Sequence, residues 1–311
     1  MEPETETTLD QTPADQQPAA PVADAQPSPP AAAAEDAPAP AVEADPPATA
    51  EGQPAPVVDV FAGMEPPEDM SAEEEEDPAE EIPTLIVMGV ADVDKRLGGG
   101  LPLETITLVE GDPESGKSVV VEQLAFNALR VGLRVVAFLS ETKPRQFLDQ
   151  MQSLGMPSMD YYLVRRLSIY PVNLRVDQER AERIMRKLLH YIEAAQGVDL
   201  IIFDSVTPLL FQFDARYVLS FLATCKDLAA LGKTIIVTLH SYAINESLRL
   251  RADSIVDAHL RLRIEELGKQ VVRTLEVAKI RGAVKTIANS VSFTVEPGIG
   301  LKTVPISKTK A

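Results

Sequence analysis

Lys117 and Ser118 directly follow a loop with a glycine at each end, Gly111 and Gly116. This spacing fits the pattern G-x-x-x-x-G-K-[ST] at every fixed position. Glycine tolerates positive φ, so such a loop can turn its backbone N–H groups inward toward an anion. The lysine would reach the β and γ phosphates of a nucleotide, and the serine hydroxyl would bind Mg²⁺. The expected cofactor-binding residues are Gly111, Asp112, Pro113, Glu114, Ser115, Gly116, Lys117, Ser118 and Val119.

The elements on either side of this loop are those that a phosphate site needs. A β-rich run, residues 105–110, leads into the loop, and a helical run, residues 118–131, leaves it. The start of a helix offers unpaired N–H groups and a positive dipole end to an anion. The alternative, a chance match within a glycine-rich turn, is disfavoured by this strand–loop–helix order. The sequence therefore predicts a site for ATP and Mg²⁺.

Three further polar residues fall where expected strands end. Asp204 closes the apolar run 200–204 and would hold Mg²⁺ through its waters. Glu141 follows the strand at 134–139 and would orient or deprotonate the attacking water. His240 follows the strand at 234–239 and would contact the γ-phosphate. Ligands of open α/β sheets bind outside the carboxyl ends of the strands, where these residues would meet. The alternative for each is a polar residue that merely ends a strand.

Strands and helices alternate over the rest of the chain. A short helix is expected near residues 90–97, longer helices at 144–155, 177–196 and 214–231, and one or two short strands at 161–171. An antiparallel hairpin is expected at 258–264 and 270–279, with its turn at Gly268, followed by a strand at 291–295. The predicted fold class is α/β, with a mostly parallel central sheet flanked by helices and extended by antiparallel strands.

The N-terminal part has a different composition. Residues 1–82 contain 22 of the 47 acidic residues, 16 of the 25 prolines and no Lys or Arg. Such a segment buries too little to offset its conformational entropy, so a disordered acidic tail is expected there. The apolar residues 57–61 are either a docking motif or a random cluster, and the acidic run 73–77 is expected to be solvated. Residues 83–311 would form one ATPase domain with a net charge of +4, since all 29 basic and 25 acidic residues lie there.

Other features narrow the class of protein. The acidic start is unlike a signal peptide, and no run reaches the roughly 18 apolar residues of a membrane span. The one cysteine, Cys225, excludes a disulfide framework and is expected to be an inert core thiol. His190 and His259 are expected on the surface or in packing. We therefore expect a soluble, cytoplasmic protein that sits against a membrane only through a partner.

Several of these residues carry a resemblance to a known family. The run 97–102, the phosphate loop, Glu141, residues 203–205 and residues 279–282 resemble the RecA/KaiC-like P-loop ATPases. The single ATPase domain and residues 295–302 are most similar to the archaellum accessory ATPases of the FlaH (ArlH) family. The resemblance covers about residues 84–308 and excludes the acidic tail. Ser140 replaces the first residue of the acidic pair of the KaiC clock proteins, which argues against a clock kinase.

The resemblance implies a RecA-like fold, ATP with Mg²⁺, and a regulatory switch with slow hydrolysis rather than a fast motor. It implies hexameric rings, and as partners a hexameric secretion-type ATPase and a polytopic membrane platform protein at the cytoplasmic face of the membrane. In ring-forming relatives Lys279 and Arg281 would reach the γ-phosphate of the neighbouring subunit. The alternative is that they form surface ion pairs.

Other functions of the same fold stay open. A KaiC/RecA-like ATPase in signalling or DNA recombination is one of them. The acidic chain has no basic cluster long enough to follow a phosphate backbone, so nucleic acid is not an expected partner. A non-catalytic scaffold, in which ATP only holds a ring together, is a third possibility, and Glu141 argues mildly against it.

Overall fold

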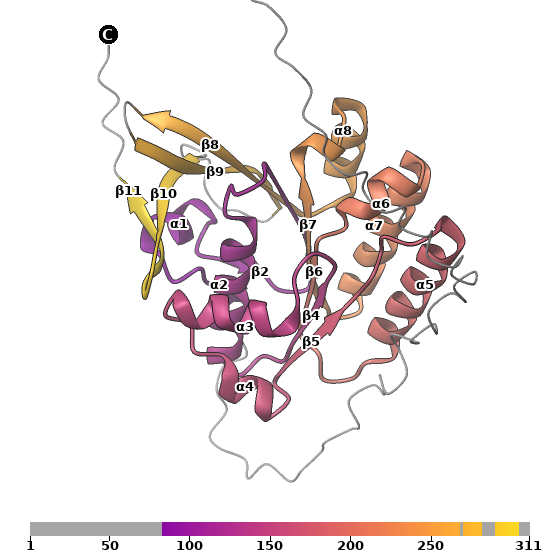
Figure 1. Ribbon diagram of the computed structural model, residues 1–311, viewed down its shortest axis with the longest axis horizontal. Helices are drawn as coiled ribbons and strands as arrows, with labels where there is room; N and C mark the ends of the chain where they lie inside the picture. The colour runs from indigo at the N-terminus through magenta and orange to yellow at the C-terminus, as the bar shows by residue number, and fades with distance from the viewer. Residues whose placement is uncertain (1–82, 268–269, 282–289, 305–311) are drawn as a thin grey trace, which may run out of the picture. The chain divides into compact units, whose positions relative to one another are not determined.

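A sheet of nine strands runs through the part of the chain that the structure describes (Figure 1). The structure is a computed structural model, and it describes residues 83–267, 270–281 and 290–304. The tail 1–82, with its stretches 57–61 and 73–77, and the predicted turn at Gly268 lie outside the described residues. Within the sheet the strand order is β11-β10-β9-β8-β3-β7-β6-β4-β5.

The core strands are the continuous apolar runs of the sequence. They are β3 (Ile106–Gly111), β4 (Val135–Leu139), β5 (Leu167–Pro171), β6 (Leu200–Asp204), β7 (Thr234–His240) and β8 (Ala258–Leu267), and all neighbours among them pair in parallel. The strands β9 (Gln270–Ile280), β10 (Ser290–Glu296) and β11 (Gly300–Val304) extend one edge with antiparallel pairing. This confirms the predicted fold class. Two short strands, β1 (Leu85–Ile86) and β2 (Leu101–Pro102), form a separate antiparallel pair.

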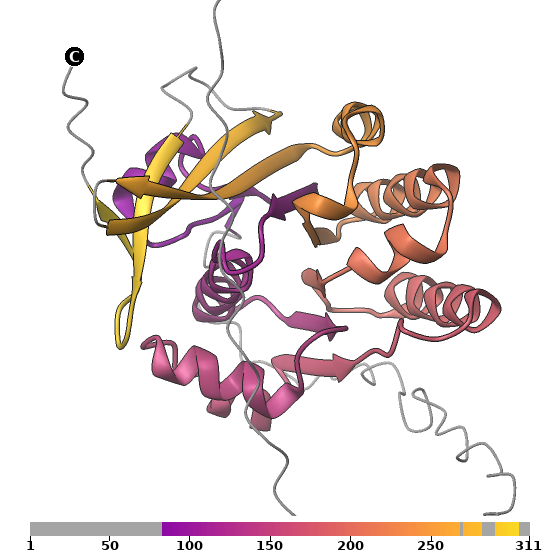
Figure 2. The same cartoon turned by 45° about the horizontal axis from the view of Figure 1, so that its top comes forward.

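Helices cover both faces of the sheet, and each face has its own apolar core (Figure 2). On one side lie α1 (Ala91–Arg96), α2 (Lys117–Arg130), α3 (Pro144–Ser153) and α4 (Met159–Leu163). On the other lie α5 (Gln178–Ala194), α6 (Thr207–Gln212), α7 (Ala215–Ala230), the 3-10 turn η1 (Ser241–Ala243) and α8 (Glu246–Ile255). Burial of both faces explains why the parallel strands are apolar throughout and not alternating.

Helix α5 begins where the sequence predicts. The side chain of Asp177 accepts a hydrogen bond from the backbone N–H of Arg180 at 2.9 Å, as an N-cap does. Of the one or two short strands predicted at 161–171 the structure has one, β5, and the first residues of that region belong to α4 instead. In α4 the ring of Tyr161 packs edge-on against Phe126 of α2, with 6.4 Å between ring centroids.

Candidate functional site

The loop between β3 and α2 has the backbone of a phosphate cradle. Gly116 has φ +94°, in the left-handed region that glycine adopts without strain. At Gly111 a Cβ atom would lie 2.5 Å from Ser115 Oγ and 2.9 Å from the backbone of Leu262. Both glycines are therefore required by the loop path, one for its dihedral angle and one for its close contacts.

The Lys117 ammonium lies at the centre of the loop. Its Nζ donates to the backbone carbonyls of Gly111 at 3.1 Å and Asp112 at 2.8 Å, and it lies 3.1 Å from His240 Nδ1. Burial lowers the pKa of Lys117, while the charges of Asp204 and Glu141 act in the opposite direction. The lysine is therefore a desolvated cation held beside the loop, where its attraction to a phosphate is stronger than in water.

Ser118 and Asp204 supply oxygen ligands from two neighbouring elements. Ser118 Oγ donates to Asp204 Oδ2 at 3.0 Å, and Thr238 Oγ1 donates to Asp204 Oδ1 at 2.6 Å. Burial raises the pKa of Asp204, although these two hydrogen bonds lower it. A hydroxyl and a carboxylate that converge in this way fit Mg²⁺, whose other ligands would be phosphate oxygens and water. The described residues hold no cluster of three or more His, Cys, Asp or Glu that would bind a metal without a nucleotide.

Glu141 is held at the same edge of the sheet by two partners. Ser205 Oγ donates to its Oε1 at 2.5 Å, and His240 Nε2 lies 3.2 Å from its Oε2. Burial alone would raise the pKa of Glu141, but the hydrogen bonds from Ser205 and His240 outweigh it and leave the pKa lowered. The carboxylate stays ionised and can orient a water and accept its proton, although its lowered pKa makes it a weaker base than an ordinary glutamate.

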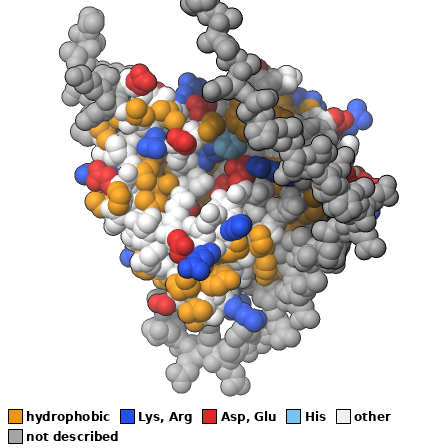
Figure 3. Space-filling view, viewed as in Figure 1, with side chains coloured by type: hydrophobic (Ala, Val, Ile, Leu, Met, Phe, Trp, Pro, Cys, Tyr) orange, Lys and Arg blue, Asp and Glu red, His pale blue; other side chains and the backbone are white. Residues whose placement is uncertain are grey.

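These residues line one cavity of about 430 Å³. Figure 3 shows a histidine between acidic and basic side chains on this face of the molecule. The cavity also contains three residues that the sequence did not indicate: Gln150, Arg273 and Val295. Arg273 donates from Nε to the carbonyl of Glu114 at 2.9 Å and so fixes the loop. No sequence pattern marks Arg273 and Val295, since only the strand order brings β9 and β10 over the phosphate loop, and Gln150 is one polar residue of helix α3.

Lys279 and Arg281 lie away from this cavity. Lys279 Nζ donates to the carbonyls of Asp253 and Val256, the latter at 2.6 Å, and Arg281 forms an ion pair with Asp257 at 3.3 Å. Asp257 is five residues before Leu262, which pairs with Gly111, so Arg281 is about 17 Å along the sheet from the loop. Lys279 pairs with His259, about 10 Å along the sheet from the loop, and its Nζ is held by the two carbonyls, so neither side chain reaches the cavity of its own subunit.

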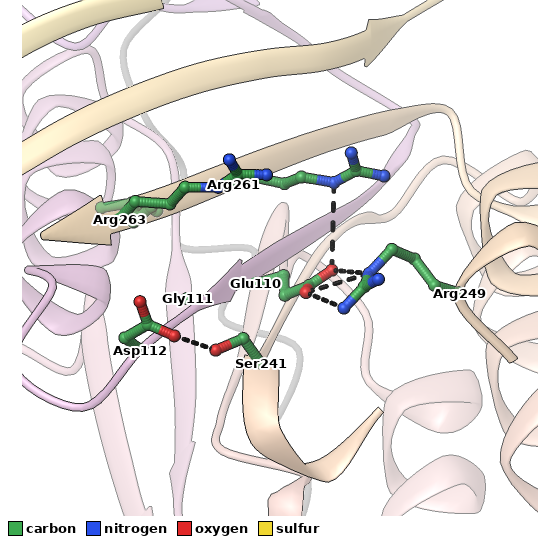
Figure 4. A pocket seen from close by; sticks show the side chains of 8 residues that line it. Glu110, Gly111, Asp112, Ser241, Arg249, Arg261 and Arg263 are labelled. Atoms are coloured by element: carbon green, nitrogen blue, oxygen red, sulfur yellow. Dashed lines mark hydrogen bonds and ion pairs between the residues drawn. The ribbon is translucent and has the colours of Figure 1, made fainter. Parts of the chain in front are cut away.

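A buried ion-pair network supports the strand that enters the loop (Figure 4). Glu110 accepts hydrogen bonds from Arg249 Nε at 2.9 Å and Nη2 at 2.7 Å, and His259 Nε2 lies 3.2 Å from its carboxylate. Asp112 accepts a hydrogen bond from Ser241. Glu110, Asp112, Ser241 and Arg249 line a second cavity of about 160 Å³. Their contacts join the end of β3 and the start of the loop to the segment that follows β7. The phosphate loop and His240 are thus parts of one connected unit.

Cys225, His190 and His259 lie outside the nucleotide cavity. Cys225 is fully buried, as predicted, and burial raises the pKa of its thiol strongly. The side chain of His190 is 81% exposed, whereas His259 is fully buried and contacts Asp253 at 2.5 Å. One of these histidines is thus a surface residue and the other a packing residue. No helix among the described residues is long and apolar enough to cross a membrane.

Comparisons with known proteins agree with this geometry. A family model described as "ATPase: KaiC" matches residues 86–307. The archaeal flagellar ATP-binding protein FlaH of Sulfolobus acidocaldarius is 29% identical over 230 residues, which cover 73% of this chain and 100% of that protein. The protein of the same name from Methanocaldococcus jannaschii is 29% identical over 213 residues, 68% of this chain and 91% of that one.

Solved structures show the same fold. The crystal structure of the flagellar accessory protein FlaH from Methanocaldococcus jannaschii superimposes with a TM-score of 0.61 at 25% identity, covering 72% of this chain and 99% of that chain. A KaiC-like protein from Pyrococcus horikoshii OT3 gives a TM-score of 0.58 at 18% identity, covering 71% and 99%.

Proposed function

Because this chain belongs to the KaiC family of ATPases over residues 86–307, we propose that it binds ATP with Mg²⁺ at the phosphate loop and acts as a nucleotide-dependent regulatory ATPase of an archaellum or a type IV pilus-like motor. The relatives to which it is similar are named archaeal flagellar ATP-binding proteins, and the similarity extends over their whole length or nearly so. In this proposal residues 83–311 are the ATPase domain and residues 1–82 are an appended acidic tail.

One observation carries the proposal: four functional groups from three separate segments meet at the carboxyl edge of the sheet. Lys117 and Ser118 come from the start of α2, Asp204 from β6 and Glu141 from the segment after β4. In the proposed mechanism Lys117 and the loop N–H groups bind the phosphates, and Ser118 and Asp204 hold Mg²⁺. The bound ion would neutralise charge on the transferred phosphoryl group. Glu141 orients the attacking water and accepts its proton.

Regulation would come from partners and assembly. We expect a hexameric ring in which Lys279 and Arg281 of one subunit reach the γ-phosphate held by the next. Arg281 lies about 17 Å along the sheet from its own loop, and Lys279 Nζ is held by the carbonyls of Asp253 and Val256, which supports action between subunits. The expected partners are a secretion-type ATPase and a polytopic membrane platform protein, which would place the chain at the cytoplasmic face of the membrane.

Phosphate release tests the catalytic part of the proposal. Wild type and Glu141→Gln would be assayed with and without the secretion-type ATPase, after nucleotide binding has been confirmed by calorimetry for both. Loss of a general base lowers the rate about 10²–10⁴-fold, so Glu141→Gln should bind ATP normally and release phosphate at least about a hundred times more slowly. Glu265→Gln, an exposed position on β8, is the matched control. Equal rates above background in all three proteins would refute Glu141 as the general base, and no release above background in any of them would leave a non-catalytic ATP-binding scaffold.

A further inference from the structure

Four arginines gather at the edge of the sheet opposite the phosphate loop. Arg134 directly precedes β4 and Arg166 directly precedes β5, and the carbonyl of Arg166 accepts a hydrogen bond from the backbone N–H of Val135 at 2.8 Å. Arg130 ends α2, and Arg165 adjoins Arg166. The short helix α4 rests on α2 through the Tyr161–Phe126 ring contact, one turn before Arg130. We call Arg130, Arg134, Arg165 and Arg166 the arginine edge.

No acidic side chain among the described residues forms an ion pair with any member of the arginine edge. Other arginines in the described part do pair: on α5, for example, Arg183 contacts Glu179 at 2.7 Å and Arg186 contacts Glu182 at 3.1 Å. The carboxylate of Asp199 accepts a hydrogen bond from the backbone N–H of Arg134 at 2.7 Å, but none of the four guanidinium groups pairs with a carboxylate among the described residues, in a chain whose net charge is −18. The missing negative charge has to be sought outside the described residues.

Apolar side chains are exposed beside these arginines. Val131 is 44%, Leu163 69% and Val164 66% exposed, and each adjoins an arginine of the edge in the sequence or lies one residue further away. In Figure 3 hydrophobic and basic side chains lie side by side over the lower part of the molecule, where Figure 1 draws α3 and α4. A surface of this kind fits an occupant that brings both negative charge and apolar groups.

We propose that residues 57–81 of the same chain occupy the arginine edge. Seven of the nine residues from 73 to 81 are Asp or Glu, and residues 57–61 are Val-Val-Asp-Val-Phe. The acidic run would pair with the guanidinium groups, which bind carboxylates with two parallel hydrogen bonds. The apolar cluster would cover Leu163 and Val164. In this proposal residues 57–61 and 73–81 have one role in common, and that role is separate from ATP binding.

The described chain begins close to the arginine edge, so residues 57–81 have only a short distance to cross. The carbonyl of Thr84 accepts a hydrogen bond from Leu103 N at 3.1 Å, and Glu104 N donates to Thr234 Oγ1, the first residue of β7, at 3.0 Å. The chain therefore enters the fold at the same edge of the sheet. From β7 the strands β4 and β5 are two and three positions away, about 10 and 14 Å. Nine extended residues span about 30 Å, so the run 73–81 covers this distance with length to spare.

Attachment in the same chain also gives the segment an advantage over competitors. A tethered ligand at this separation acts at an effective concentration in the millimolar range. A free acidic peptide, a second copy or an anionic lipid surface would have to displace it. The arginine edge is therefore covered by its own chain until a stronger anionic partner binds, and the nucleotide edge stays open throughout.

Distance measurements between spin labels test the proposal in the full chain. Cys225 is fully buried, so labels attach selectively to introduced cysteines. Ala79→Cys with Met159→Cys reports on the arginine edge, and Ala79→Cys with Val271→Cys, on exposed β9, is the control pair. We expect a short, narrow distance for the first pair only. It should be lost in 1 M NaCl, where the Debye length is about 3 Å, and after replacement of the five residues 73–77 by their amides.

Further arms separate the alternatives. Arg130→Gln with Arg165→Gln and Arg166→Gln should abolish the short distance while ATP binding is unchanged. A distance that appears only when singly labelled chains are mixed would overturn the proposal in favour of a second copy. A broad distribution for the first pair, together with binding of the chain to vesicles of phosphatidylglycerol and phosphatidylcholine at physiological salt that the arginine substitutions abolish, would overturn it in favour of a lipid surface. A broad distribution that ignores salt and both sets of substitutions would overturn it outright.

Discussion

The buried carboxyl of Glu122 leads to a prediction about stability against pH. Glu122 lies on α2 and is 1% exposed, and no described residue forms a hydrogen bond with its Oε2. Burial, and after it the negative charge of Asp204, raises its pKa from 4.5 to about 9. At neutral pH the folded protein therefore keeps a proton on Glu122 that the unfolded chain releases. The perturbation that removes this difference is Glu122→Gln, which has the same shape and no titration.

The sign and the size follow from linkage. Between the unfolded and folded pKa values the native state binds one more proton than the unfolded state, so stability falls as pH rises. Each pH unit corresponds to 1.36 kcal/mol, which makes the loss between pH 6 and pH 8 about 2.7 kcal/mol from this group. For a domain of about 220 residues this lowers the melting temperature by about 5–11 °C. Glu122→Gln should lack this component, so its advantage over wild type should grow from pH 6 to pH 8.

Thermal unfolding followed by circular dichroism at pH 6, 7 and 8 measures the effect. Wild type, Glu122→Gln and the exposed control Glu265→Gln would be compared in the same buffers, so that all other titrating groups cancel in the differences. The control should follow wild type at each pH. If the melting temperatures of wild type and Glu122→Gln move in parallel over this range, Glu122 is ionised in the folded protein and the burial argument is wrong.

Three further predictions concern the loop and the distant arginine. Lys117→Ala should weaken ATP binding at least about a hundredfold by calorimetry with unchanged circular dichroism, because hydrogen bonds to charged groups contribute about 1.5–3 kcal/mol each; affinity within a few-fold of wild type would refute the loop assignment. Gly116→Ala and Gly232→Ala both place a side chain at positive φ, costing about 1–2 kcal/mol, but only the first brings the Cβ within 3.3 Å of other side chains. Chemical denaturation should therefore show a larger loss for Gly116→Ala, and equal losses would mean that the loop is not tightly packed. Arg281→Ala should leave ATP binding by the monomer intact and remove ring formation or hydrolysis, as followed by light scattering and phosphate release; unchanged assembly and turnover would refute a role between subunits.

The sequence predicts the core of this fold because the pattern and the environment coincide there. Strands β4 and β6 are buried on both faces, so nothing but apolar residues suits them, and their ends mark the polar site. Helix α8 was not predicted, although Asn245 caps it by accepting from Leu248 N at 2.9 Å. This helix is short and buries only Leu248 and Ala252, so its periodicity is weak.

The parts of the site that escaped prediction depend on strand order. Arg273 reaches the phosphate loop because β9 lies next to β8, which in turn pairs with β3. Nothing in the sequence near Arg273 reports that neighbourhood, since it is 159 residues from Glu114. The burial of Glu122 could not be predicted for a different reason. In the sequence of α2 it is one polar residue among apolar ones, and only the three-dimensional packing shows that water does not reach it.

The contacts of Lys117 have a consequence for how the pocket would respond to occupancy. An ammonium has three N–H donors, and those of Lys117 already face two loop carbonyls and the imidazole of His240. A phosphate that binds Lys117 must therefore replace one of these three contacts. If the phosphate displaces the imidazole, the end of β7 loses the contact between His240 and Lys117 when the nucleotide binds. Ser241 and Arg249, which follow β7, form hydrogen bonds with Asp112 and with Glu110 of β3. Binding of a nucleotide would therefore change contacts that extend from the loop to α8, the helix that carries Arg249.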